Sequence, residues 1–230
     1  MTAGMPQSLP GVRACVFDAY GTLFDVGNIA VDLERQTGVA SKAFSDVWRT
    51  KQLQYSWVRS LTGQHADFWQ VTLDALDFAL SAFGVSDASL RAQAMDSYLR
   101  LPVFPDVAPT LERLRSNGLR LAVLSNGAPR MLGAALAHAG ISGHFEAVLS
   151  VEEAGIFKPH PSVYALCTER LGLRVTEICF VSSNGWDAWS AKAFGFRVVW
   201  CNRSGQPPEH LPSAPDGEVA DLRELASWLA

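Results

Sequence analysis

The feature that most constrains the fold is an apolar run that ends abruptly in a carboxylate and a glycine turn, Cys15-Val16-Phe17-Asp18-Ala19-Tyr20-Gly21-Thr22-Leu23-Phe24. Residues up to Phe17 are predicted to form a buried parallel strand, because the run is short, contains β-branched and aromatic residues and is closed by Gly-Thr. Asp18 then lies at the carboxyl end of that strand. Ligands of open α/β sheets bind just beyond such strand ends, so Asp18 is a candidate nucleophile. It could equally cap the following turn, where aspartate is common.

The pattern after Thr22 is helical for about eighty residues, which is long for a crossover between neighbouring parallel strands. From Phe104 onward helices and strands alternate, as in a parallel sheet covered on both faces. The predicted fold is therefore α/β, with a Rossmann-like parallel sheet core and an inserted helical-bundle cap domain. The core comprises residues 11–22 and 104–230, the cap comprises residues 23–103, and residues 1–10 form a flexible amino-terminal segment.

Three local patterns give more specific expectations. The segment 221–229 is predicted to be a capped amphipathic helix, and the Pro- and Ser-rich segment 204–217 an exposed loop. One cap helix is predicted to bury a seam of apolar residues at alternating spacings of four and three: Trp69, Leu73, Leu76, Leu80 and Phe83.

Charge and cysteine content exclude several classes of function. A net charge of −4 without any basic run argues against nucleic acid or an anionic membrane as partner. The four cysteines have no paired spacing and are expected to be buried thiols rather than zinc ligands or disulfides. No apolar run approaches membrane-spanning length and the amino end lacks a signal pattern, so a cytoplasmic location is expected.

Polar side chains follow the apolar runs at strand after strand, and the carboxyl ends of parallel strands meet at one edge of a sheet. The set consists of Asp18, Ser125, Asn126, Lys158, Ser182, Asn184 and Asp187. Lys158 alone could be a surface lysine. Beside Asp18 it would favour the ionised carboxylate and keep it available as a nucleophile. Tyr164 lies one helical turn beyond Pro161, where its hydroxyl could reach the same site.

The order Asp-x-Tyr-Gly-Thr, Ser-Asn-Gly, Lys-Pro and Ser-Ser-Asn-x-Trp-Asp resembles the haloacid dehalogenase superfamily almost end to end. More narrowly, residues 17–26, 48–53 and 182–187 resemble the type II (S)-2-haloacid dehalogenases. The resemblance implies hydrolysis of short (S)-2-haloalkanoic acids and haloacetates to 2-hydroxy acids and halide, through an ester on Asp18. It implies no metal and no other cofactor, a small-molecule 2-haloacid as the partner, and, together with the apolar cap helices, a homodimer.

The residues also bear on a rival chemistry, because most members of this superfamily resemble phosphatases. The phosphatases of the superfamily are similar to one another in carrying a second Asp two residues after the nucleophile and an acidic pair further along the chain. Tyr20 and Ser182-Ser183 stand at those places here. Magnesium would be poorly held by so few carboxylates, which favours carbon–halogen over phosphate chemistry. A phosphatase that tolerates the altered motif, or a catalytically silent module that binds small carboxylates, stays as an alternative.

The resemblance also implies a role for each site residue. Arg49 would receive the departing halide, although its helical position alone also suits a solvated arginine. Asp187 would help to activate the hydrolytic water, with Asn184 and Ser182 orienting it. Ser125 and Asn126 would hold the substrate carboxylate. The catalytic set is completed by Thr22, Lys158 and Tyr164, and the apolar pocket around the substrate by Tyr20, Leu53, Phe68 and Trp186.

Overall fold

The core of the protein is a six-stranded parallel sheet with the strand order β3-β2-β1-β4-β5-β6. The structure of the chain is a computed structural model that describes residues 8–27, 34 and 40–229. The strands are β1 (Ala14–Phe17), β2 (Arg120–Ser125), β3 (Ala147–Ser150), β4 (Ile178–Ser182), β5 (Arg197–Cys201) and β6 (Gly217–Val219). The predicted α/β fold with a Rossmann-like sheet is confirmed.

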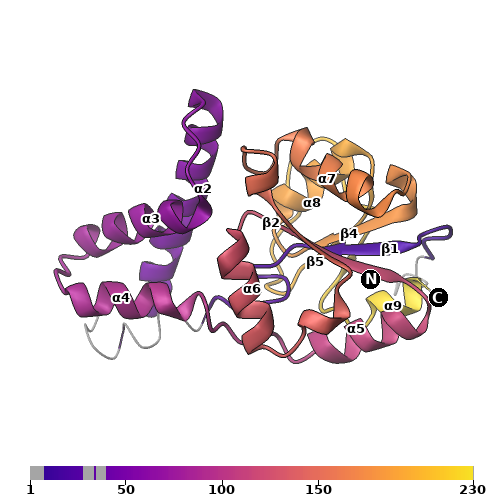
Figure 1. The fold of residues 1–230 in the computed structure, drawn as a ribbon, viewed down its shortest axis with the longest axis horizontal. Coiled ribbons are helices and arrows are strands. Elements are labelled where there is room, and N and C mark those ends of the chain that lie inside the picture. Colours follow the sequence, from indigo (N-terminus) through magenta and orange to yellow (C-terminus); the bar gives the residue numbers. More distant parts are fainter. Residues whose placement is uncertain (1–7, 28–33, 35–39, 230) are drawn as a thin grey trace.

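Helices cover both faces of this sheet (Figure 1). One face is covered by α5 (Val107–Ser116), α6 (Pro129–His138) and α9 (Leu225–Trp228), and the other by α7 (Pro161–Leu171) and α8 (Gly185–Phe194). Because β1 has β2 on one side and β4 on the other, the strand order reverses beside it. Such a reversal opens a crevice at the carboxyl ends of the two central strands, and Asp18 directly follows β1 there.

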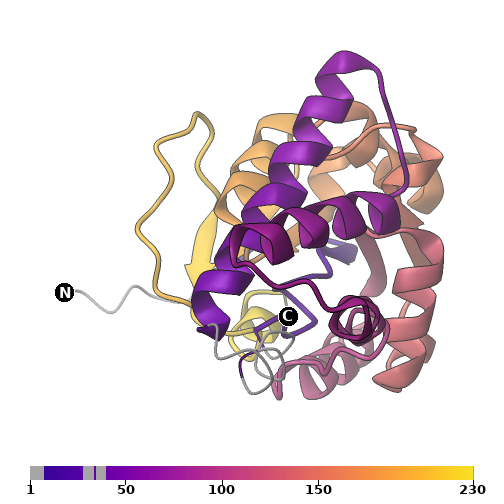
Figure 2. The ribbon, with the colours of Figure 1, turned by 90° about the vertical axis from the view of Figure 1, so that its left-hand side faces the viewer.

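Beside the carboxyl ends of the strands, the described residues form a separate layer of helices: α2 (Ser41–Thr62), α3 (Phe68–Ala82) and α4 (Ala88–Ser97) (Figures 1 and 2). The chain leaves the core and returns to it along two adjacent segments, where Phe24 and Val103 form an antiparallel bridge. This arrangement supports the predicted insertion of a cap at residues 23–103, whose boundaries stay a prediction.

Arg203, just after β5, joins both of these crossings. Its guanidinium donates to the Thr22 carbonyl at 2.9 Å, and it makes two bonds of 3.0 Å to the buried Asp106 carboxylate. The same group lies 4.0 Å from the centre of the Phe104 ring. One side chain of the core therefore contacts the chain where it enters the cap and where it leaves it.

The cap contacts the core on its other side through aromatic side chains. Trp57 of α2 meets Trp186 of α8 edge to face, with ring centres 5.6 Å apart. Within the cap, the indole of Trp48 donates to the Thr72 carbonyl at 2.9 Å and thereby ties α2 to α3.

Some local predictions were wrong. The predicted seam of α3 is right only in part, because Leu76 and Leu80 are buried whereas the other three members, Trp69, Leu73 and Phe83, are partly buried. The rest of the buried face is formed by Phe68, Val71, Thr72, Ala75 and Ala79. The predicted helix at 221–229 is reduced to α9, because the Leu222 N–H donates to Asp106 instead of forming a helical bond.

The remaining expectations fall on the ends of the chain and on its thiols. Residues 1–7 of the expected flexible segment lie outside the described residues, whereas Leu9 is buried and its N–H donates to the Trp228 carbonyl at 3.0 Å. The exposed loop at 204–217 ends in the unforeseen edge strand β6, and it extends from the body in Figure 2. All four cysteines are buried free thiols, as predicted. In the described part of the chain, no helix is long and apolar enough to cross a membrane.

Candidate active site

The Asp18 carboxylate lies at the carboxyl end of β1, nearly buried, and both of its oxygens accept hydrogen bonds. Oδ1 accepts from the Lys158 ammonium at 3.1 Å. Oδ2 accepts from the Thr22 hydroxyl at 3.0 Å and from the Asn184 amide at 2.9 Å. Three donors, one of them charged, therefore orient the carboxylate, as a nucleophilic group requires. This is a richer set of contacts than a turn cap requires.

Lys158 is fully buried between two carboxylates. Its ammonium lies 3.1 Å from Asp18 and 2.9 Å from Asp187. Burial alone would disfavour the charged ammonium, but the two carboxylates outweigh it and raise the pKa of Lys158 above its ordinary value. Lys158 is therefore a permanent cation inside the site rather than a surface lysine.

Asp187 stands behind Lys158, with no exposed surface. One of its oxygens accepts from Lys158, and the other accepts from the Tyr164 hydroxyl at 2.7 Å. Burial is the largest influence on Asp187 and raises the pKa of its carboxyl, against the pull of Lys158. Burial likewise keeps the pKa of Tyr164 well above its ordinary value, so its hydroxyl keeps its proton and donates.

The loop between β4 and α8 and the turn after β1 hold each other in place. The Thr22 hydroxyl donates to Asp18 and accepts from the Ser183 N–H at 2.8 Å. The Ser182 hydroxyl accepts from the Asn184 N–H at 3.1 Å, which shapes the start of α8. As a result, the Asn184 side chain points at Asp18, in keeping with its predicted place.

Arg49 reaches the site from the cap helix α2. Its guanidinium donates to the Asn184 side-chain oxygen at 2.6 Å and approaches the Tyr20 carbonyl at 3.4 Å. Both partners are neutral, so the positive charge of Arg49 is not cancelled by these contacts. An anion in the pocket would therefore meet a cation at the cap side.

Ser125 and Asn126 follow β2 on the other side of β1. The Asn126 side-chain oxygen accepts from the Lys158 backbone N–H at 3.0 Å, and the Ser125 hydroxyl accepts from the Gly127 N–H at 3.1 Å. Gly127 leaves space for the Tyr20 ring, since a Cβ there would lie 2.7 Å from Tyr20 Cε2. The glycine thus lets the aromatic wall approach the backbone closely.

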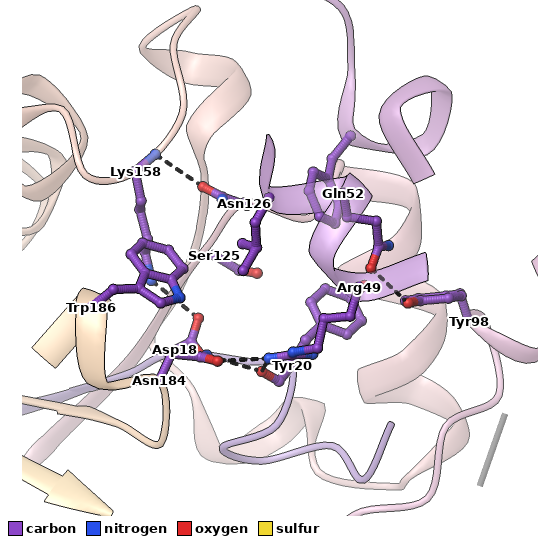
Figure 3. A pocket seen from close by; sticks show the side chains of 12 residues that line it. Asp18, Tyr20, Arg49, Gln52, Tyr98, Ser125, Asn126, Lys158, Asn184 and Trp186 are labelled. Atoms are coloured by element: carbon purple, nitrogen blue, oxygen red, sulfur yellow. Dashed lines mark hydrogen bonds and ion pairs between the residues drawn. The ribbon is translucent and has the colours of Figure 1, made fainter. Parts of the chain in front are cut away.

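These side chains enclose a cavity of about 40 Å³ between core and cap (Figure 3). Four of its twelve lining residues are aromatic, and most of the others are polar or charged. The lining residues are Asp18, Tyr20, Arg49, Gln52, Leu53, Phe68, Tyr98, Ser125, Asn126, Lys158, Asn184 and Trp186. Among the residues described, no group of three or more His, Cys, Asp or Glu is placed to hold a metal ion.

Residues 12–195 match the sequence profile of the haloacid dehalogenase-like hydrolases. The chain belongs to this family. The chain is 44% identical to (S)-2-haloacid dehalogenase 4A of Burkholderia cepacia, over 95% of both chains. It is 40% identical to haloacetate dehalogenase H-2 of Moraxella sp. (strain B), over 95% of this chain and 98% of that one. The predicted resemblance is confirmed.

A solved structure of this hydrolase family matches the whole architecture. It is the L-2-haloacid dehalogenase from Xanthobacter autotrophicus with chloropropionic acid covalently bound. The TM-score is 0.88 at 42% identity, covering 94% of this chain and 97% of that one. In that relative, chloropropionic acid forms a covalent bond with the protein.

The structure brings the predicted site residues of this hydrolase together in two shells around Asp18. Ten of them line the cavity, whereas Thr22, Tyr164, Ser182 and Asp187 lie behind it and contact those that do. Their roles in the reaction stay proposals.

Two lining residues, Gln52 and Tyr98, were not foreseen from the sequence. The Tyr98 hydroxyl donates to the Gln52 side-chain oxygen at 3.1 Å, and the Gln52 amide donates to the Thr72 hydroxyl at 3.0 Å. Gln52 follows Arg49 by three residues on α2, so helical spacing could have indicated it. Tyr98 has no comparable signal, because its place depends on how the end of α4 packs.

Proposed function

We propose that this hydrolase converts short (S)-2-haloalkanoic acids and haloacetates to 2-hydroxy acids and halide through an ester on Asp18. The observation that carries the proposal is a nearly buried carboxylate, Asp18, that lines a small cavity with Lys158 as its buried ion-pair partner and with Arg49 reaching the same cavity from the cap. The (S)-2-haloacid and haloacetate dehalogenases that this chain resembles support the class of substrate.

In the first step, an oxygen of Asp18 attacks C2 of the substrate. A carbon–oxygen bond forms as the carbon–halogen bond breaks, and the halide leaves with the bonding electrons toward Arg49, with inversion at C2. Ser125 and Asn126, which line the cavity, bind the substrate carboxylate. The wall formed by Tyr20, Phe68 and their neighbours keeps water from competing with the carboxylate in this step.

In the second step, water attacks the carboxyl carbon of the ester. The 2-hydroxy acid leaves with an oxygen that belonged to Asp18, the water oxygen stays in the restored carboxylate, and a proton is released. That Asp187 activates this water remains a prediction. Both of its oxygens already accept hydrogen bonds, and these contacts support a role in holding Lys158 against Asp18.

We also propose that the reaction needs no metal ion. Lys158 occupies the place between Asp18 and Asp187 and supplies a positive charge there, and Tyr20 stands where the related phosphatases carry a second acid. Halide displacement from carbon creates one monovalent anion, which a guanidinium can stabilise.

The decisive experiment measures halide release from (S)-2-chloropropionate in EDTA and follows oxygen isotopes in heavy-oxygen water. In a single turnover the product should carry unlabelled oxygen, and Asp18 should gain the label, seen by mass spectrometry of its peptide. Label in the first product would contradict the ester. Faster, magnesium-dependent turnover of a phosphate ester would favour the phosphatase alternative. Substrate binding without halide release or labelling would favour the silent module.

We further propose a cytoplasmic homodimer. Exposed apolar side chains on the cap support the dimer, namely Val58 and Leu61, three residues apart on α2, and Phe78 on α3. Sedimentation velocity should give a mass near twice 25.0 kDa, and a concentration-independent monomer would contradict the proposal.

A further inference from the structure

A second contact between cap and core lies outside the cavity, where the connection from α2 to α3 meets the segment after β3. Both oxygens of Glu152 are engaged there by the cap. Oε1 accepts from the Phe68 N–H at 3.1 Å, and Oε2 lies 2.8 Å from Nε2 of His65. The side chains of Glu152 and His65 remain 21% and 27% exposed, so solvent reaches this contact.

On the core side, Glu152 is held by the short helix η2 (Val151–Glu153), which the Ser150 hydroxyl caps by accepting from the Glu152 N–H at 3.3 Å. The same hydroxyl donates to the Gly127 carbonyl at 2.7 Å. Gly127 follows Asn126, which lines the cavity. The Glu152 carboxylate is thus attached to the backbone that carries one wall of the site.

On the cap side, Glu152 holds the opposite wall. Phe68 is the first residue of α3 and lines the cavity, with its ring centre 6.5 Å from that of Tyr20 and 6.0 Å from that of Phe157. The His65 ring covers Phe157 at 4.9 Å. Phe157 directly precedes Lys158, so the contact lies next to two parts of the site.

We infer that Glu152 is a positioning residue for substrate selection. By accepting from the Phe68 N–H, it fixes the start of α3 and thereby the depth at which the Phe68 ring enters the cavity. This inference rests on the proposed function. It assigns part of the preference among 2-haloacids of different chain length to a carboxylate that does not touch the substrate.

The neighbouring Glu153 provides a matched comparison. It lies in the same short helix but forms a surface pair with Arg170 at 2.7 Å, on side chains that are 39% and 52% exposed. Removal of either glutamate deletes one surface-reachable carboxylate from η2. Only removal of Glu152 releases Phe68.

The test compares Glu152→Ala, Glu152→Gln and Glu153→Ala by their kcat/KM for (S)-2-chloropropionate and chloroacetate. One methyl group in an apolar pocket is worth about 10- to 200-fold in kcat/KM, so a loosened Phe68 should lower the ratio of the two values by about tenfold in Glu152→Ala. Glu152→Gln keeps an oxygen for the Phe68 N–H and should stay within about twofold of the wild type. An unchanged ratio in Glu152→Ala, or an equal change in Glu153→Ala, would overturn the inference.

Hydrogen exchange of the Phe68 amide, measured without substrate, gives a readout that does not depend on activity. It should accelerate in Glu152→Ala and not in Glu153→Ala, and equal rates would overturn the inference. If Glu152→Ala fails to fold, Glu152→Asp replaces it, because its shorter side chain keeps the charge but cannot reach the Phe68 N–H. A wild-type protein that releases no halide would refute the proposed function, while the exchange rates would still decide whether Glu152 holds Phe68.

Discussion

Asp18 is nearly buried, yet an ammonium, a hydroxyl and an amide all lie within 3.1 Å of its carboxylate oxygens. An oxygen of Asp18 can attack the substrate from a free direction while all three of these hydrogen bonds are kept. The carboxylate is therefore desolvated before the substrate arrives, which is favourable for attack on carbon.

Replacement of Asp18 by Asn should abolish halide release, with a fall in kcat of about 10³-fold or more, because an amide oxygen is a far weaker nucleophile. The fold should persist, since Lys158 keeps Asp187 as a partner. Halide titration gives the activity and thermal unfolding gives the control. A variant that still turns over rapidly would contradict Asp18 as the nucleophile.

Site residues that directly follow strands could be predicted from the sequence better than site residues that reach the cavity from the cap. Asp18, Asn126, Lys158 and Asn184 could be predicted because the ends of parallel strands must converge. Tyr98 could not, because helix packing in the cap decides where it points. The full burial of Asp187 behind Lys158 could not be predicted either, because the distance of a residue from the cavity depends on how the whole chain packs.

Among the secondary-structure elements, α2 has two tasks. It packs the cap through Trp48 and carries Arg49 to the core. Arg49 and Lys51 are neighbours on this helix with different surroundings: the guanidinium meets neutral acceptors in the cavity, and the ammonium lies over the Phe78 ring at 4.2 Å. Substitutions of these two residues can therefore separate an effect on anion binding from an effect on the helix itself.

Arg49→Ala should lower kcat/KM for 2-chloropropionate by about 10²-fold, because the departing halide loses its cation. The free energy of unfolding should change by less than about 1 kcal/mol, as for most arginines without a buried ionic partner. Lys51→Ala should change neither quantity appreciably. Urea unfolding and halide release measure the two effects, and equal losses of stability and turnover would indicate a structural arginine.

Two glycines, Gly127 just before α6 and Gly133 within it, should respond oppositely to substitution by alanine. A Cβ at Gly127 would lie 2.7 Å from Tyr20 Cε2, so Gly127→Ala should cost about 1–3 kcal/mol and raise KM as Tyr20 shifts into the cavity. A Cβ at Gly133 meets nothing within 4 Å, so Gly133→Ala should stabilise the helix by about 0.5–1 kcal/mol. Urea titration separates the two, and stabilisation by Gly127→Ala would refute the close approach.

The strand that ends before Asp18 and the alternation of helices and strands from Phe104 onward could be predicted, because buried parallel strands are short apolar runs between glycine and proline signals. The buried face of α3 could be predicted only in part. Leu76 and Leu80 are buried as predicted, but they share that face with the small Ala75 and Ala79, while Trp69 is only half-buried. Side-chain size alone therefore identifies only part of the seam.

Taken as a whole, the molecule joins its two layers at opposite ends. Arg203 contacts both crossings of the chain, and Glu152 joins the far side of the cap to the core. Asp106 is the buried partner of Arg203. Burial opposes the ionised form of Asp106, but its bonds to Arg203 and to the Leu222 N–H outweigh this and hold the pKa of its carboxyl below the ordinary value.

The lowered pKa of Asp106 predicts part of the fall in the free energy of unfolding at acidic pH. Because the pKa of Asp106 is lower in the folded chain, its contribution is present above the unfolded value of about 3.9 and is lost as the pH falls through the folded value. Asp106→Asn should therefore cost about 2 kcal/mol at pH 7, with a smaller loss on acidification than the wild type shows. Urea midpoints between pH 7 and pH 3 measure both.

Asp96→Asn is the control for this prediction. Asp96, near the end of α4, forms an exposed ion pair with Arg100 at 3.3 Å, so its removal should cost less than about 0.5 kcal/mol at any pH. If the free energy of unfolding falls as steeply between pH 7 and pH 3 in Asp106→Asn as in the wild type, other carboxylates govern this fall.

The edge-to-face pair of Trp57 and Trp186 spans the boundary between the layers, and one of its members lines the cavity. Indoles that couple at 5.6 Å respond optically to a change in either distance or angle. The chain thus contains a built-in spectroscopic label: near-ultraviolet circular dichroism should change when substrate arrives or when cap and core separate, above the constant contribution of the Trp189–Trp200 pair within the core.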